Sequence, residues 1–166
     1  MRKFIVACLM TIALCACRPA PTATFEAPAA EYINKEGKGT IEGHAFFRDE
    51  KGSVFYAAGE HVFLIPVTTY AEQRMAQVFG TAKYVQAKFL PWDQSDAGFR
   101  KYMRSTKAES TGTFKFEKVA PGDYFVATTV SWLPENSFIM KGGAIYEKVT
   151  LTGKEKDAVK VIVSGK

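Results

Sequence analysis

Cysteine is absent from this sequence after Cys17. The three cysteines, Cys8, Cys15 and Cys17, all fall within the first 17 of 166 residues. The rest of the chain therefore forms no disulfide within itself and no thiolate metal site. Histidine is also scarce, because His44 and His61 are the only two. Without a third clustered ligand, two histidines so far apart favour surface positions over a metal pair, although neighbouring strands would bring them together.

The sequence also lacks an apolar run long enough to cross a membrane as a helix. The run over residues 4–16 is too short, because a spanning helix needs about 20 apolar residues. The short basic stretch Met1-Arg2-Lys3 precedes it, and this layout is typical of a secretory signal. We expect residues 1–16 to be a signal peptide that is removed.

The residues around Cys17 resemble the lipobox of bacterial lipoproteins. Leu14 is the aliphatic residue at −3 and Ala16 the small residue at −1, followed by the obligatory cysteine. Cys15 fits less well, because Leu14 would then take the small-residue position. The resemblance implies lipidation of Cys17, with palmitate among the acyl chains, and several chains on one cysteine anchor a protein persistently. A cleaved secretory signal followed by a free or paired Cys17 is the alternative.

The stretch after Cys17 bears on localisation and on domain boundaries. Arg18, rather than Asp, follows the cysteine, and by resemblance to enterobacterial lipoproteins this implies an outer-membrane anchor facing the periplasm. Residues 18–30 contain three prolines and no apolar period, which predicts an extended tether of about 40 Å. We expect a lipidated N-terminus with a flexible tether over 17–38 and one folded domain over 39–166.

Positive charge exceeds negative charge only slightly in this sequence. Once Arg2 and Lys3 leave with the signal, 20 Lys and Arg against 17 Asp and Glu leave a net charge of +3. Such a balance gives no argument for nucleic acid, and solubility alone explains it. The remaining 150 residues suit one domain with a proper core.

From Gly39 onwards the apolar residues mostly recur with a period of two. Over residues 40–48, Ile41 and Ala45 share one face while Glu42 and His44 share the other. Residues 61–67 are apolar on both faces, so something must cover the outer face of that sheet. Pro66 lacks a backbone donor, and we expect strand pairing to break near it.

A helix is predicted directly after that strand. Thr69 and Glu72 have the spacing of a capping box, and Gly80 stands where the helix would stop. One helical stripe holds Ala71, Met75, Val78 and Phe79. We expect this stripe to lie against one sheet.

Strand patterns resume after residue 112. Residues 113–117 and 123–132 alternate, and later stripes are formed by residues 145, 149 and 151 and by residues 159, 161 and 163. Six or seven short strands with turn signals between them predict an all-β fold, a β-sandwich.

Residues 110–126 resemble the GxFxFxxLxPGxYxV segment of carboxypeptidase regulatory-like domains. Residues 39–43 and 59–64 match the first two strands of that family. The resemblance implies a transthyretin-like sandwich of about seven strands, with one or two short helices in an insert after the second strand. It places Phe114, Phe116 and Tyr124 between the sheets and brings no catalytic residues.

The insert over residues 81–107 mixes aromatic and basic residues and leaves two interpretations open. Trp92, Tyr102 and Arg104 are candidate partner-binding residues if the insert is a recognition surface. We favour the second interpretation, in which the aromatic residues pack on the sandwich and Arg104 is solvated and replaceable. Ser95 or Asp96 is expected to cap a short helix that runs to Arg104.

The sequence shows no catalytic signature, so we expect no enzyme activity, no cofactor and no metal. The function that it favours is a lipid-anchored periplasmic module that binds or scaffolds a protein of the cell envelope. The alternative is carbohydrate or small-ligand binding through residues 81–107. The transthyretin-fold lipoproteins of type VI secretion share the anchor and the sandwich, but no motif here selects them.

Overall fold

The structure is a computed structural model, which describes residues 22–90 and 95–165. The described elements are α1 (Ala27–Ala30), η1 (Glu31–Asn34), β1 (Gly39–Arg48), β2 (Val54–Tyr56), β3 (His61–Pro66), α2 (Thr69–Phe79), β4 (Tyr84–Gln86), η2 (Ala87–Phe89), α3 (Ala97–Lys101), β5 (Arg104–Lys107), β6 (Thr113–Val119), β7 (Gly122–Trp132), β8 (Lys141–Leu151) and β9 (Val159–Ser164).

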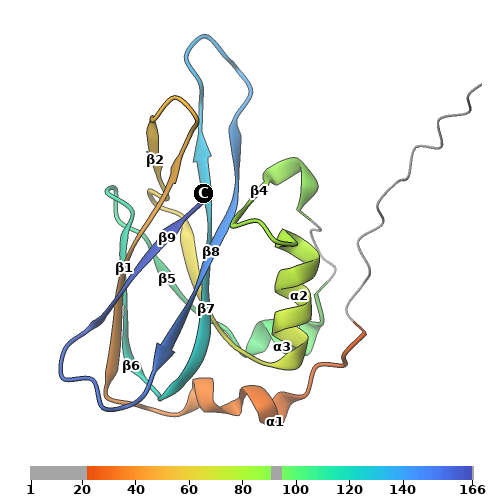
Figure 1. Cartoon of the computed structure of the whole chain (residues 1–166), viewed down its shortest axis with the longest axis vertical. Helices are drawn as coiled ribbons and strands as arrows, with labels where there is room; N and C mark the ends of the chain where they lie inside the picture. Colours follow the sequence, from red (N-terminus) through yellow and green to blue (C-terminus); the bar gives the residue numbers. More distant parts are fainter. Residues whose placement is uncertain (1–21, 91–94, 166) are drawn as a thin grey trace, which may run out of the picture.

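These strands form two sheets that face each other (Figure 1). In the four-stranded sheet, β1 pairs antiparallel with β2 and β6 and parallel with β9. The five-stranded sheet has the order β4-β8-β7-β3-β5, with all pairs antiparallel. The chain is therefore an all-β sandwich with a few short helices, as the sequence predicts.

The main hydrophobic core lies between the two sheets. Phe114, Phe116 and Tyr124 are all buried there, which confirms their predicted positions. Gly43 on β1 leaves room for the Phe114 ring, because a Cβ at Gly43 would meet that ring at 2.1 Å. The stripes predicted on β7, β8 and β9 also face this core. Period-two patterning therefore predicted the core faces correctly.

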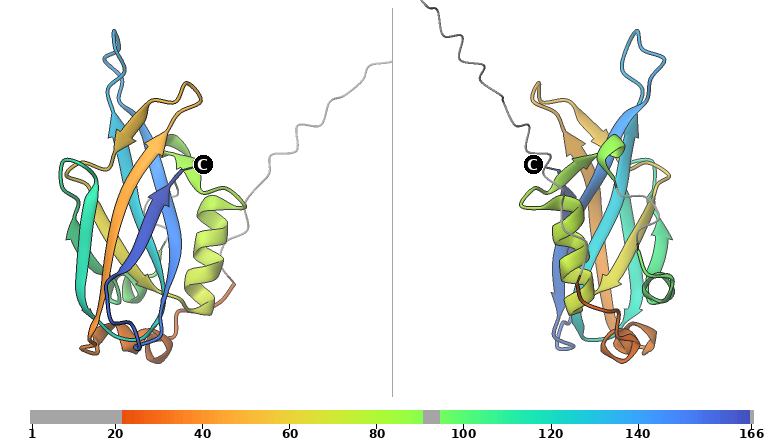
Figure 2. Two further views of the ribbon diagram at one scale, coloured as in Figure 1. Left: turned by 60° about the vertical axis from the view of Figure 1, so that its left-hand side comes forward. Right: turned by 90° about the vertical axis from the view of Figure 1, so that its right-hand side faces the viewer.

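A second core covers the outer face of the five-stranded sheet. Helix α2 lies along that face in both views of Figure 2, and Ala71, Met75 and Phe79 are buried there against Ile65 and Phe125. The predicted helix and its docking are confirmed. Its cap differs by one residue from the prediction, because the Thr68 hydroxyl, and not that of Thr69, accepts from the Ala71 amide at 3.1 Å.

The expected tether is folded onto the domain from Thr22 onwards. Ala30 and Ile33 are buried, and the Phe25 ring lies 5.6 Å from that of Phe99. The Tyr32 hydroxyl donates to the Asp123 carbonyl at 2.5 Å, and its ring packs over Gly122. We call residues 22–38 the N-terminal strap. The prolines of residues 18–30 suggested an extended chain, but apolar side chains before and after Pro28 pack on the sandwich.

Three strands escaped the sequence prediction, so there are nine described strands rather than about seven. β2, β4 and β5 have three or four residues each, and β5 reads Arg-Ser-Thr-Lys, which has no apolar alternation. The predicted helix to Arg104 ends at Lys101, and Asp96 caps it through its side chain. Near Pro66 the pairing of β3 with β5 stops at Leu64, whereas Pro66 still lies opposite Tyr124 of β7.

Within residues 22–90 and 95–165, no helix has the length and apolar character needed to cross a membrane.

Candidate functional site

The first candidate site lies at the end of the sandwich that is opposite the strap. Here the β1–β2 and β7–β8 hairpins project, at the top of Figure 1, while α1 lies at the foot. We call this the open end and the opposite one the closed end. A cleft of about 1520 Å³ lies between the two hairpins. Its lining includes Phe47, Phe55, Tyr84, Trp132, Ile139 and Met140.

Stacked aromatic rings form the inner wall of this cleft. The Trp132 ring of β7 stacks on Phe55 with a centroid distance of 4.3 Å, and Phe47 stacks on Tyr84 at 4.4 Å. The Tyr84 hydroxyl donates to the Gly142 carbonyl at 3.1 Å, which ties β4 to β8. Burial raises the pKa of that hydroxyl. The wall is therefore held by contacts from five strands.

Above this wall, the β7–β8 connection exposes apolar side chains. Phe138 is fully exposed and Ile139 is 74% exposed, and Leu133 and Met140 are each more than half exposed. Clustered apolar residues on a soluble domain commonly mark an interaction site. The charged residues that line the cleft are of both signs: Arg48, Asp49, Glu50, Lys51, Lys88, Glu135 and Lys141.

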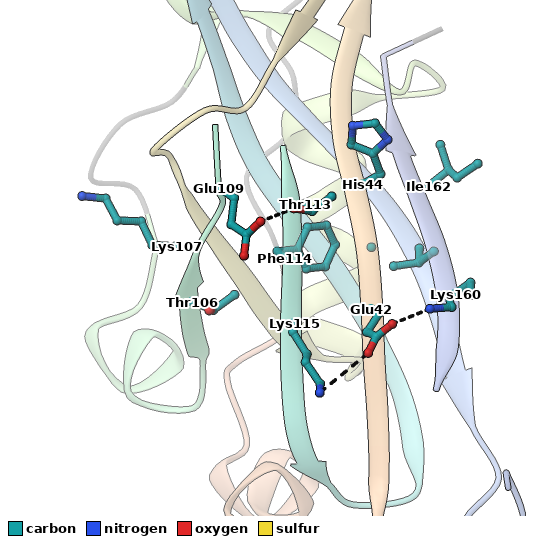
Figure 3. A pocket seen from close by; sticks show the side chains of 12 residues that line it. Glu42, His44, Thr106, Lys107, Glu109, Thr113, Phe114, Lys115, Lys160 and Ile162 are labelled. Carbon is teal, nitrogen blue, oxygen red and sulfur yellow. Dashed lines mark hydrogen bonds and ion pairs between the residues drawn. The ribbon is translucent and has the colours of Figure 1, made fainter. Parts of the chain in front are cut away.

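The second candidate site is the outer face of the four-stranded sheet, where a pocket of about 580 Å³ lies over β1, β6 and β9 (Figure 3). Strand register arranges the side chains of this face in three rows across the sheet, and the first two of them line the pocket. The rows are Lys115-Glu42-Lys160, Thr113-His44-Ile162 and Tyr56-Phe46-Ser164. We call them the charged row, the middle row and the aromatic row.

The charged row carries a carboxylate between two ammonium groups. Lys160 donates to Glu42, and the Lys115 ammonium lies 3.7 Å from the same carboxylate. The hydrogen bond from Lys160 lowers the pKa of the Glu42 carboxyl, and the hydrogen bond to Glu117 raises the pKa of Lys115. The Glu42 carboxylate and the Lys115 ammonium therefore keep their charges near neutral pH.

The other two rows supply rings and hydrogen-bonding groups. The His44 ring stacks on Tyr56 with a centroid distance of 5.2 Å and an interplanar angle of 15°. His44 Nε2 lies 2.6 Å from the Thr111 carbonyl oxygen, which only accepts, so Nε2 carries the proton. In the neutral ring Nδ1 is then an acceptor. The Thr113 hydroxyl donates to Glu109 at 2.8 Å.

The residues predicted from the sequence lie elsewhere. Cys17 and Trp92 fall outside the described residues. Tyr102 is half-buried against the main core, and its ring is 5.4 Å from that of Phe25. Phe99 of the same insert is buried, whereas Phe89 is 61% exposed. The described part of the insert therefore mostly packs, and a partner contact at Trp92, Tyr102 and Arg104 stays a prediction.

Arg104 corrects the expectation of a solvated, replaceable side chain. Its guanidinium donates to the carbonyls of Glu117 at 2.6 Å and Lys118 at 3.3 Å. These carbonyls belong to β6, whereas Arg104 opens β5 of the other sheet. The side chain therefore joins the edges of the two sheets.

No group of three or more His, Asp or Glu side chains that could hold a metal occurs in the described part of the chain. His44 and His61 lie on β1 and β3, which belong to different sheets.

Sequence reasoning missed both candidate sites for different reasons. The run Phe138-Ile139-Met140 between Pro134 and Lys141 was a readable signal, because consecutive apolar residues in a loop are unusual unless functional. The three rows were not readable, because Lys160 meets Glu42 only through the parallel pairing of strands 118 residues apart.

A two-sheet β-sandwich with two open surfaces is thus the class that the fold and sites define. No family model matches the sequence, and no curated protein matches it. Among solved structures, the chain is similar to a Pseudomonas aeruginosa protein described as a "putative carbohydrate binding protein". The two share 21% identity with a TM-score of 0.69, over 86% of this chain and 98% of that one. This likeness shows a shared fold.

Proposed function

We propose that this protein is a non-enzymatic binding module of the bacterial cell envelope, anchored by lipid at Cys17, which holds a protein partner at its open end. The lipobox-like residues before Cys17 support the anchor. By the same resemblance, the anchor lies in the outer membrane and the domain faces the periplasm. The resemblance of residues 110–126 to carboxypeptidase regulatory-like domains supports a non-enzymatic role, because that motif is structural and brings no catalytic residues.

The observation that carries this proposal is the group of exposed apolar side chains in the β7–β8 connection, above the aromatic cleft. We call this group, Leu133, Phe138, Ile139 and Met140, the tip. A fully exposed Phe138 beside Ile139 contributes nothing to the fold and leaves apolar area in water. A protein interface has an apolar centre and a polar rim, and this cleft has both. The rim carries charges of both signs, with Asp49, Glu50 and Glu135 beside four cations, as the polar rim of a protein interface does.

Capture of the partner from cross-linked intact envelopes tests the proposal. Phe138→Ser should leave the melting temperature unchanged, because the side chain has no packing to lose. It should weaken partner capture by roughly 2 kcal/mol, as truncation of an interface hot spot does. Lys154→Ser, an exposed position in the connection between β8 and β9, is the matched control and should capture normally. Undiminished capture by Phe138→Ser would refute the proposal.

The anchor is tested separately by Cys17→Ser. This variant should accumulate as an unprocessed precursor without incorporated palmitate and should leave the membrane fraction after the signal is removed in vitro. Palmitate labelling that survives the substitution would contradict lipidation at Cys17. So would a mature N-terminus at another residue.

Carbohydrate binding is the second candidate function. The Pseudomonas aeruginosa protein with the same fold carries that description, which favours it. In this chain three of the four described rings of the insert, Tyr84, Phe99 and Tyr102, are at least half-buried, and only Phe89 is mostly exposed, so the insert offers little aromatic surface to a sugar. The outer face of the four-stranded sheet offers more.

A further inference from the structure

The two outer faces of the sandwich are treated differently by the fold. Helices α2 and α3 and the strap cover the five-stranded sheet, whereas the outer face of the four-stranded sheet has no cover among the described residues (Figure 2). A solvated face alone is ordinary in an antiparallel sheet. Its aromatic row and its charge distribution make this one unusual.

The aromatic row presents a ring to solvent at a fixed angle. Tyr56 is 43% exposed, and the parallel His44 ring behind it holds its plane. Phe46 lies directly opposite Tyr56 in the β1–β2 pairing and supports the same patch. A held aromatic face with one side free is suited to stack on a flat, partly apolar ring.

The pocket itself lies beside the aromatic row and is lined by three lysines and two glutamates. Lys107, Lys115 and Lys160 line it against Glu42 and Glu109. Glu42 pairs with Lys160 and lies 3.7 Å from the Lys115 ammonium, which also pairs with Glu117 at 2.7 Å. Glu109 accepts from the Thr113 hydroxyl. Lys107 has no ion pair within the described residues. A ligand carboxylate would therefore share Lys115 and Lys160 with the carboxylates that already contact them, with Lys107 nearby as a further cation of the same pocket.

The spacing of the rows sets the size of the ligand. Glu42 and Phe46 are four residues apart on β1, so the charged row and the aromatic row lie about 13 Å apart along the strand. Between them the middle row offers the Thr113 hydroxyl and His44 Nδ1 as hydrogen-bonding groups. A ligand that uses both ends must therefore be longer than one sugar ring and hydroxylated along its length.

We propose that the outer face of the four-stranded sheet binds an acidic oligosaccharide, with one sugar ring on Tyr56 and a carboxylate on Lys115 and Lys160. The inference sharpens the carbohydrate candidate by naming its chemical class and its residues. It does not depend on the protein partner proposed for the open end. Figure 3 shows Lys115, Glu42 and Lys160 side by side with His44 above them on β1.

Calorimetry on the purified full chain in detergent tests this with two matched probes, tetragalacturonate and its methyl ester. The acid should bind, and the uncharged ester should bind about tenfold more weakly because it loses the charge-assisted hydrogen bonds. Lys160→Gln should lower the affinity for the acid by a similar factor and leave the affinity for the ester unchanged. Tyr56→Ala should weaken both probes, because stacking does not depend on charge. Lys154→Gln makes the same charge change off this face and should bind like the parent.

Several results would overturn the inference. These are equal affinity for the acid and the ester, no binding of either, or an equal effect of Lys154→Gln and Lys160→Gln. Equal competition by hexaglutamate would show that the face takes acidic peptides rather than sugars. None of these substitutions lies at the apolar tip, so partner capture by the same variants separates failure here from failure of the proposed protein interface.

Discussion

Strand β7 runs from the closed end of the sandwich, where its side chains are buried, to the open end, where the chain that follows it exposes apolar side chains. At the closed end Tyr124 is fully buried, and its hydroxyl donates to the Ala120 carbonyl at 2.8 Å. At the open end Trp132 stacks on Phe55 beside the cleft, and the chain continues into the exposed tip around Phe138. At the closed end the tyrosine hydroxyls are hydrogen-bonded to backbone carbonyls. At the open end apolar side chains are exposed to solvent and do not pack on other side chains to the same extent.

The difference suggests a division of labour along the strands. The strap packs Tyr32 and Ile33 over the closed end, so that end contributes packing and hydrogen bonds to the free energy of unfolding. At the tip, Phe138 adds no contacts that substitution could remove, because its side chain is fully exposed. Substitutions at the two ends should therefore separate stability from binding.

The largest effect is expected at Tyr124. Tyr124→Ala should lower the free energy of unfolding by about 3–5 kcal/mol, because it leaves a cavity in a core that cannot collapse around it. Tyr124→Phe keeps the ring and should cost about 1 kcal/mol, the value of its hydrogen bond. Urea unfolding measures the free energy of unfolding of both variants, provided that its dependence on urea concentration is the same as in the parent. A Tyr124→Ala variant as stable as the parent would mean that the closed end does not hold the fold together.

Alkaline pH should loosen the strap through Tyr32. Burial raises the pKa of Tyr32 to about 12, from about 10 in the unfolded chain. Because the folded pKa is the higher one, the contribution of Tyr32 is complete below pH 10 and is lost as pH rises towards 12. Melting temperatures between pH 8 and pH 11.5 should fall more steeply for the parent than for Tyr32→Phe. Parallel curves for the two proteins would contradict the burial of this hydroxyl.

A smaller effect is expected at the sheet edge beside the closed end. Arg104→Ala should cost about 1 kcal/mol, because two carbonyls of β6 lose a charged donor but can turn to water. Arg104→Lys should not restore the loss in full, since one ammonium cannot reproduce the fork of the guanidinium. Thermal melts of the three proteins decide it. An unshifted melting curve for Arg104→Ala would support the expectation from the sequence that the Arg104 side chain is solvated and replaceable.

The smallest effect on stability is expected at the tip. Phe138→Ser and Ile139→Ser should each shift the free energy of unfolding by less than about 0.5 kcal/mol, as exposed positions do. Differential scanning calorimetry on both variants measures this. A clear loss of stability in either one would place the tip among the folded contacts and remove the contrast between the ends.

How much the sequence revealed depended on the range of the interactions involved. Alternation over residues 113–117 and 123–132 grouped Phe114, Phe116 and Tyr124 on strand faces, because a strand with one buried face records that face in its own residues. The resemblance to carboxypeptidase regulatory-like domains then placed those faces between the sheets. β5 left no such record, since Arg104 and its neighbours sit at a sheet edge with half-exposed side chains. The strap was hidden for another reason, because the three prolines of residues 18–30, of which Pro28 lies in the strap, obscured the apolar anchors Phe25, Tyr32 and Ile33.

The candidate sites divide along the same line. The apolar run of the tip is local, and three adjacent residues could have revealed it. The face around Glu42 brings together β1, β6 and β9, whose register depends on the whole sandwich. No local pattern in β1 indicates that Lys160 will lie beside Glu42.

A photo-reactive residue at position 138, compared with one at position 154, probes the contrast between the ends in intact envelopes. Both positions are exposed and neither contributes to the core, so both labelled proteins should fold and reach the envelope. If the open end holds the partner, illumination should give a discrete cross-linked protein from position 138 and none from position 154. Equal cross-linking from both positions, or a discrete product from position 154 alone, would contradict the assignment of binding to the open end.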